Sequence, residues 1–218
     1  MYFSIDQTAQ LNKRVGKLEK NTHVELVTAV VGRCDNYPEI PWKAFAMGTA
    51  ICALLVLIQD YVLPGWTGSY RVLFNIVFVL GTGAFIALLT VFWPGFARLF
   101  LDKTRAKTEA EQFARSFFLE REIFKTRERT GILMLIGLFE HQVIILPDSG
   151  VADRVDPQDL KQVITQMTVS LKKGDFFKAL NQGINALEDR LSEKGFKGVP
   201  GAVNQIPDEP IEQKGADK

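Results

Sequence analysis

Charge almost disappears from the sequence between Pro41 and Arg98, and this gap constrains the fold more than any other feature. Residues 44–59 are all apolar, small or weakly polar, and the run extends to Leu63. A second run of the same kind covers residues 72–93. About 20 apolar residues in a helix cross the roughly 30 Å hydrocarbon core of a membrane. The sequence therefore predicts two membrane-spanning helices.

The segment between the two runs, residues 64–71, contains Pro64, Gly65 and Gly68, which break helices and favour a tight turn. Two helices joined by such a turn form a hairpin. The alternative is that these are buried core helices, but a domain of this size rarely buries two adjacent helices that are apolar on every side. Aromatic and basic side chains are expected at the membrane interfaces, and the candidates are Trp42, Tyr61, Trp66, Tyr70, Trp93, Arg98, Lys103 and Arg105.

Basic residues flank the predicted hairpin unevenly. The turn holds only Arg71, whereas the flanking segments carry Arg33, Lys43, Arg98, Lys103, Arg105 and Lys107. The positive-inside rule then predicts a two-pass protein with both termini in the cytoplasm. The first twenty residues contain no apolar stretch, so we expect no cleavable signal and insertion directed by the hairpin itself. The cluster at residues 98–107 is expected to contact anionic lipid headgroups.

The overall composition excludes several classes of protein. Lys and Arg number 26 against 25 Asp and Glu, so the net charge of +1 provides no basic field that would indicate a nucleic-acid partner. The two cysteines, Cys34 and Cys52, are too few for a disulfide framework or a Cys-rich metal site. Both are compatible with a reducing compartment.

Outside the hairpin, the hydrophobic pattern predicts a mixed α/β domain. The expected elements are a helix at residues 5–20, a strand at 24–31, a helix at 108–125, strands at 131–139 and 142–146, and helices beginning near Asp156 and Asp175. From Phe196 onward the Gly, Pro and charge content leaves too little apolar surface to fold. Residues 196–218 are therefore predicted to form a disordered tail.

The first predicted strand finds its partners only after the hairpin. A strand, a crossover helix and a second strand make a parallel βαβ unit, and the tight turn at Glu140 and His141 makes the third strand antiparallel to the second. We therefore expect one cytoplasmic domain threaded through a membrane anchor. Its predicted divisions are 1–40 (helix and first strand), 41–97 (hairpin), 98–195 (the remainder of the domain) and 196–218 (tail).

Several stretches outside the hairpin resemble the TPM domain family. They are VELV at residues 24–27, FARSFF at 113–118, GILMLI at 131–136, FEHQVIILPDSG at 139–150 and DFFKAL at 175–180. Their order and spacing are most similar to the bacterial membrane-anchored branch, in which a hairpin is inserted after the first strand. The resemblance implies an α/β/α sandwich of TPM type in a bacterial inner membrane.

Some TPM relatives are described as acid phosphatases or calcium binders, so the resemblance implies Ca²⁺ or Mg²⁺ as cofactor candidates. Many relatives carry Asp-Asn-Gly before the second strand, where this chain has Arg129-Thr130-Gly131. A divalent ion there would lose a carboxylate ligand and meet a positive charge. The chain therefore departs from the family pattern at the position where a metal is expected.

The predicted topology places the polar candidates at the two ends of the sheet. Asp35, Glu140 and His141 follow the carboxyl ends of the parallel strands, where ligands of open sheets usually bind. Asp148, Asp153 and Asp156 gather at the other end and supply oxygen ligands for a cation, or a carboxylate pair for acid catalysis. The alternatives are a turn at Asp148, a helix cap at Asp156 and a merely solvated His141. Cys34 is interpreted as a strand-end cysteine, with a reactive thiolate as the alternative.

From the resemblance we expect a non-catalytic binding or assembly module in membrane-protein assembly or maintenance. Its expected partners are the lipid bilayer and either another membrane protein or further copies of the chain. The alternative is a metal-dependent phosphatase that uses Asp148, Asp153 and Asp156. A multimeric pore is a third hypothesis, although neither span carries a row of polar residues.

Overall fold

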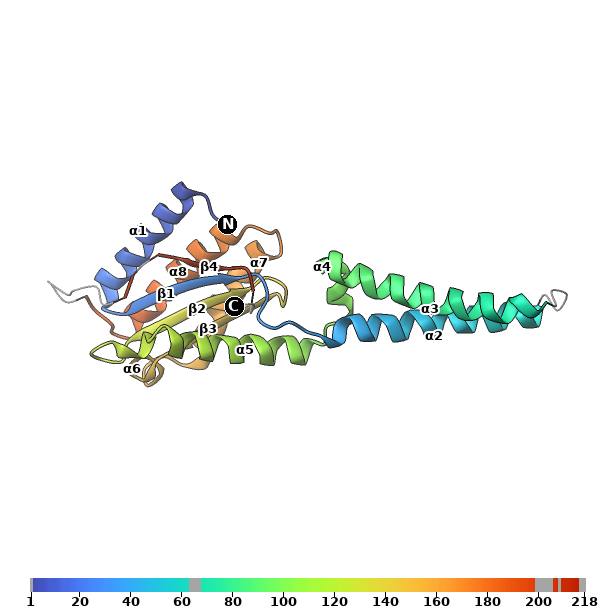
Figure 1. The fold of residues 1–218 in the computed structure, drawn as a ribbon. Helices are drawn as coiled ribbons and strands as arrows, with labels where there is room; N and C mark the ends of the chain where they lie inside the picture. Colours follow the sequence, from blue (N-terminus) through green and yellow to red (C-terminus); the bar gives the residue numbers. More distant parts are fainter. Residues whose placement is uncertain (1, 63–67, 199–205, 208, 216–218) are drawn as a thin grey trace. The chain divides into compact units, whose positions relative to one another are not determined.

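The computed structural model describes residues 2–62, 68–198, 206–207 and 209–215, and it contains two compact units (Figure 1). The first unit combines Met1–Asp35 with Lys107–Lys218, so it is built from both halves of the chain. The second unit is the continuous segment Asn36–Ala106, which contains the two long apolar helices. The predicted divisions at residues 1–40, 41–97 and 98–195 are finer than these two units and stay predictions.

A four-stranded sheet forms the centre of the first unit, in the order β3-β2-β1-β4. β1 (Glu25–Val31) pairs in parallel with β2 (Gly131–Gly137), in a register from Glu25 opposite Gly131 to Val31 opposite Gly137. β3 (Gln142–Pro147) pairs antiparallel with β2. Both predicted pairings are confirmed. The β1–β2 ladder therefore joins the chain segment that precedes the inserted hairpin to the segment that follows it.

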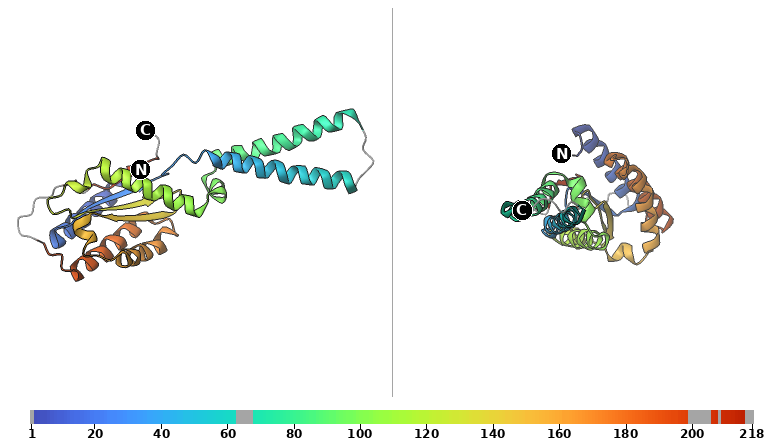
Figure 2. Two further views of the ribbon diagram at one scale, coloured as in Figure 1. Left: turned by 90° about the horizontal axis from the view of Figure 1, so that it is seen from below. Right: turned by 90° about the vertical axis from the view of Figure 1, so that its right-hand side faces the viewer.

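Helices cover both faces of this sheet (Figures 1 and 2). On one face lie α1 (Ile5–Thr22), α7 (Pro157–Leu171) and α8 (Phe176–Glu193), and on the other lies α5 (Lys103–Glu120). Successive side chains of a strand point to opposite faces, so Ile132, Met134 and Ile136 join the core under α1, α7 and α8, whereas Leu133 and Leu135 join the core under α5. The predicted α/β/α sandwich is confirmed.

Local contacts explain where the elements depart from their predicted bounds. β2 ends at Gly137 instead of residue 139, because residues 138–141 form the turn that leads into β3. α5 ends at Glu120 instead of residue 125, and Glu122 then adopts a left-handed backbone with φ of 54°. Short helical turns fill the connections: α4 (Pro94–Ala97), η1 (Arg98–Phe100), η2 (Ile123–Lys125) and α6 (Ser149–Ala152).

The prediction of disorder throughout residues 196–218 is wrong for the part of this segment that the structure describes. Phe196 is buried in the core, and β4 (Ile211–Gln213) pairs in parallel with β1 opposite Ala29–Val31. The apolar residues Ile206 and Ile211 pack against the core under α5. Few apolar residues suffice here, because the edge of β1 supplies ready hydrogen-bond partners. Residues 199–205, 208 and 216–218 of the predicted tail lie outside the described residues.

The second unit is built on α2 (Glu39–Val62) and α3 (Ser69–Phe92), which pack along each other. Each is long and apolar enough to cross a membrane. In the most apolar 18-residue stretches of the two helices, only 11% and 6% of the residues are buried. A core helix of a soluble protein would instead be mostly buried. The turn at 63–67, with Trp66, lies outside the described residues.

Glycines bring α2 and α3 close together. A Cβ added to Gly83 would lie 2.3 Å from Cγ2 of Thr49, and one added to Gly48 would lie 2.8 Å from Cδ1 of Ile86. Both positions therefore exclude a larger side chain, as expected where helices in lipid approach closely. Asp60, near the end of α2, forms an ion pair with Arg71, near the start of α3.

The helix contact predicts opposite effects for two neighbouring glycines of α3. Gly83→Ala should destabilise the hairpin by about 1–3 kcal/mol, because the new methyl group overlaps Thr49. Gly81→Ala is the matched control, since no described atom lies within 4 Å of the added Cβ and alanine is the better helix former. Unfolding by SDS titration, followed by circular dichroism, measures both. Equal losses in the two variants would contradict this packing.

Candidate functional site

The carboxyl ends of β1 and β2 meet in a buried cluster made by Cys34, Gly137 and Glu140. The backbone N–H of Cys34 donates to Oε1 of Glu140 at 2.8 Å. A Cβ added to Gly137 would lie 2.9 Å from Oε2 of Glu140 and 3.0 Å from Sγ of Cys34. Glycine at the end of β2 therefore makes room for the carboxylate and the thiol. Glu140, in turn, ties the β2–β3 turn to the segment that leaves β1.

The environment of Cys34 keeps its thiol protonated. Burial raises the pKa of this thiol well above its ordinary value near 9.0, and the charge and hydrogen bonding of Glu140 raise it further. The charge of Asp35 acts in the same direction. Because the thiolate is the reactive species, these contacts favour a structural strand-end cysteine over a nucleophile.

The other candidates at this end differ in exposure. Asp35 is half-buried, whereas His141 is exposed and adopts a left-handed backbone with φ of 53°. The guanidinium of Arg33 lies 4.2 Å from the centre of the Phe139 ring, which adds a cation–π contact across the same strand ends. The structure thus brings Glu140 together with Cys34, and it leaves His141 at the surface of the turn.

At the opposite end of the sheet, Asp148 is buried beside a cation. Nε of Arg129 lies 3.0 Å from Oδ2 of Asp148, and Oδ1 accepts a hydrogen bond from the backbone N–H of Ser149 at 2.7 Å. Asp148 thereby caps the short helix α6. The backbone N–H of Gly150 donates to the carbonyl of Arg129 at 3.0 Å. The predicted turn role of Asp148 agrees with these contacts, which join the loops before β2 and after β3.

Asp153 and Asp156 do not share this environment. Both are exposed, Asp153 at the end of α6 and Asp156 directly before Pro157, where α7 begins. Asp156 holds the predicted cap position, but within the described chain its side chain makes no capping hydrogen bond. Among the described residues, no group of three or more His, Cys, Asp or Glu side chains is arranged to hold a metal ion. The arrangement around Asp148 therefore does not fit the predicted Ca²⁺ or Mg²⁺ site, and Arg129 supplies the positive charge there.

A third polar contact involves the two ends of the chain and was missed by sequence reasoning. The carboxylate of Glu212 in β4 accepts hydrogen bonds from the backbone N–H groups of Tyr2 at 2.7 Å and Phe3 at 3.1 Å. Glu25 of β1 likewise accepts from the N–H of Ile206 at 3.2 Å. The only sequence signal for this contact is the pair of isoleucines, Ile206 and Ile211, in an otherwise polar segment.

The predicted membrane-interface residues lie at the surface of the second unit. Trp42, Tyr61, Tyr70 and Trp93 are between 63% and 89% exposed, and Trp66 lies outside the described residues. Lys103 is exposed and Arg98 is half-buried, whereas Arg105 pairs with Glu39, its Nε lying 3.1 Å from Oε1. The rings of Trp93, Phe96 and Phe100 lie in sequence along α4 and η1, with centroids 6.5 and 5.5 Å apart.

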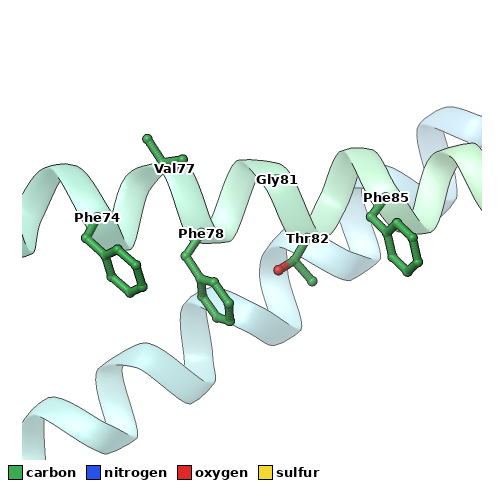
Figure 3. Close-up of a pocket in the computed structure, with 6 residues that line it drawn as sticks. All are labelled: Phe74, Val77, Phe78, Gly81, Thr82 and Phe85. Carbon is green, nitrogen blue, oxygen red and sulfur yellow. The ribbon is translucent and has the colours of Figure 1, made fainter.

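One side of α3 carries a shallow groove of about 390 Å³ (Figure 3). Its lining residues are Phe74, Val77, Phe78, Gly81, Thr82 and Phe85. Gly81 forms a notch between the aromatic side chains, and Thr82 points toward α2 in the close-up, where its hydroxyl lies 3.7 Å from Sγ of Cys52. The groove is apolar and open, which suits a lipid chain or another helix better than a polar substrate.

Comparison with protein families identifies one segment of the chain. Residues 97–190, which include α5, β2, β3 and α7, match the model of the TPM domain. This segment is therefore similar to a TPM domain. The match begins after the hairpin and does not include β1.

Comparison with solved structures gives the same fold. The NMR structure of the BA42 protein from the psychrophilic bacterium Bizionia argentinensis is similar with a TM-score of 0.58 and 12% sequence identity, over 97% of this chain and 96% of that chain. At this identity the likeness concerns the fold alone. A search of curated protein sequences gave no significant match.

The raised pKa of Cys34 predicts a specific loss of stability in alkaline solution. The folded state holds the thiol proton more tightly than the unfolded state, so its contribution is complete below pH 9.0 and falls as the pH rises above that value. The loss should approach about 1.4 kcal/mol per pH unit. Urea unfolding of the wild type and of Cys34→Ala between pH 8 and pH 10.5 isolates the effect. Parallel pH profiles for the two proteins would contradict it.

Proposed function

We propose that this protein is a membrane-anchored TPM domain that acts as a non-catalytic binding or assembly module. In this proposal α2 and α3 cross the bacterial inner membrane, and both chain termini and the whole TPM domain lie in the cytoplasm. The domain binds another membrane protein, or further copies of the chain, during the assembly or maintenance of membrane proteins.

The surface of the hairpin supports the membrane anchor. Large apolar side chains are exposed along both helices, including Leu54, Leu57, Phe78 and Phe85, each more than half exposed. Monomeric soluble proteins rarely expose apolar patches of this extent. Lipid tails cover such a surface without cost, because they are as apolar as the side chains.

The charges at the two ends of the hairpin support the orientation. Lys43 and Lys103 are exposed at the end that joins the TPM domain, and Arg98 is half-buried there. At the other end, the charge of Arg71 is balanced by Asp60. Cationic side chains concentrate on the cytoplasmic side of membrane proteins, and this distribution supports the proposed cytoplasmic position of the TPM domain.

The contacts of the buried carboxylates Glu140 and Asp148 favour binding over catalysis, and the non-catalytic part of the proposal rests on this observation. Glu140 holds the N–H of Cys34, and Asp148 holds Arg129 while capping α6. Both carboxylates therefore connect loops to the ends of strands. The competing function is a phosphatase that uses Asp148, Asp153 and Asp156 with Ca²⁺ or Mg²⁺, and the name of the matching family, TPM phosphatase, favours it.

Native mass spectrometry of the full chain, extracted with its own lipids and partners, tests the binding function. We expect a mass larger than that of one 24.5 kDa chain, either as a multiple of it or with a second protein present. Only single chains at every protein concentration would contradict the proposal. In the same preparation, hydrolysis of p-nitrophenyl phosphate with Ca²⁺ or Mg²⁺ should not exceed the buffer rate. Hydrolysis that is lost in Asp148→Asn but kept in the exposed control Glu209→Gln would establish the phosphatase instead.

A further inference from the structure

We propose that the edge of β1 at Ala29–Gly32 is a binding site for an extended peptide strand. In this proposal β4 occupies the site and can be displaced by a partner strand. This inference deepens the proposed binding function, on which it rests, by assigning a surface and a partner chemistry. The partner is a protein segment that adds to the sheet as a parallel strand and carries a carboxylate at the position of Glu212.

The contacts of β4 define what the site recognises. The backbone N–H of Gly32 donates to the carbonyl of Gln213 at 2.8 Å, and Ile211 packs against the core under α5. A Cβ added to Gly32 would lie 2.2 Å from the carbonyl oxygen of Lys214, so glycine permits the close backbone approach. Backbone pairing of this kind supplies affinity in strand addition, and side-chain contacts supply specificity.

The carboxylate of Glu212 gives the site its chemical selectivity. Its two oxygens accept from the N–H groups of Tyr2 and Phe3, so one acidic side chain satisfies two backbone donors. Charge-assisted hydrogen bonds of this type are about twice as strong as neutral ones. A competing strand needs an Asp or Glu at the same place to replace both bonds.

The strand β4 that occupies this edge is short. β4 pairs with three residues of β1, whereas β2 pairs with all seven. Further along the same edge, the N–H of Leu26 is held by the side chain of Glu19 at 3.0 Å instead of by a strand. A partner strand that pairs with more than three residues of β1 can therefore outcompete β4.

The tail therefore acts as an intramolecular competitor for the edge. A tethered segment has an effective concentration in the millimolar range, which weakens the binding of any free strand. Releasing β4 removes this competition. For a free strand with an affinity of about 0.1 mM, release should tighten the apparent affinity by about tenfold.

Fluorescence anisotropy with the full-length chain in detergent tests this site. The probe is a labelled synthetic peptide with the sequence of residues 206–218, and the chains are the wild type, Glu212→Ala and the control Glu209→Ala. Glu209 is an exposed acidic residue of the same segment. We expect Glu212→Ala to bind the peptide about tenfold more tightly than the other two chains. A peptide with alanine in place of Glu212 should bind none of them.

Hydrogen exchange at the Gly32 amide shows independently whether β4 has been released, since this N–H bonds to Gln213. Faster exchange in Glu212→Ala without peptide binding would overturn the proposal. So would unchanged exchange, because β4 would then not depend on Glu212, and so would equal peptide binding by all three chains. None of these results alters the complex mass expected from the proposed function. A failure of the strand-binding site can therefore be distinguished from a failure of the proposed function.

Discussion

The parallel ladder between β1 and β2 is the constraint on which the rest of the structure depends. All seven residues of β1 are buried and pair with β2, which follows the hairpin in the sequence. A central strand without a partner would bury unsatisfied backbone groups. The domain therefore cannot complete its sheet until the segment that follows α2 and α3 in the sequence is available. This couples the folding of the domain to the formation of the hairpin.

The same ladder explains why the most conspicuous polar residues have structural roles. Glu140 and Asp148 lie where loops must be joined to the ends of the sheet, and each accepts hydrogen bonds or an ion pair from a neighbouring loop. Buried carboxylates require such partners. The contacts at the edge of the sheet differ from those at the ends of its strands. At the edge, only the three-residue strand β4 covers β1 in the described structure. Binding by strand exchange at that edge would leave the core unchanged.

Sequence patterns predicted most of this fold because its strongest signals are periodic. The apolar runs of α2 and α3 and the spacing of Leu11, Val15 and Leu18 in α1 depend only on nearby residues. β4 was missed because its pairing is made by β1 far away in sequence, and its own three residues carry almost no pattern. The end of β2 was misplaced because Leu138 and Phe139 continue the apolar run of the strand, although both already belong to the turn.

The sequence predicted the positions of the candidate residues in the fold better than it predicted their roles. Topology alone indicated that Glu140 follows the carboxyl end of a parallel strand, but its contact with Cys34 depends on the missing side chain of Gly137. The three aspartates near α6 were grouped because the predicted topology places them at the same end of the sheet. Only Asp148 turned inward to meet Arg129, because a turn of helix separates it from Asp153 and directs their side chains differently.

Site-specific labelling in living cells tests most directly whether a membrane hairpin interrupts one folding unit. Lys20 and Lys178 are exposed, and one precedes the hairpin in sequence whereas the other follows it. Because the natural cysteines are buried, a cysteine introduced at either position is the accessible thiol that the label detects. A membrane-impermeant maleimide should leave both unlabelled in intact cells and label both in inverted vesicles, whereas a cysteine in place of Tyr70 should show the reverse. Labelling of positions 20 and 178 from opposite faces of the membrane would contradict the account.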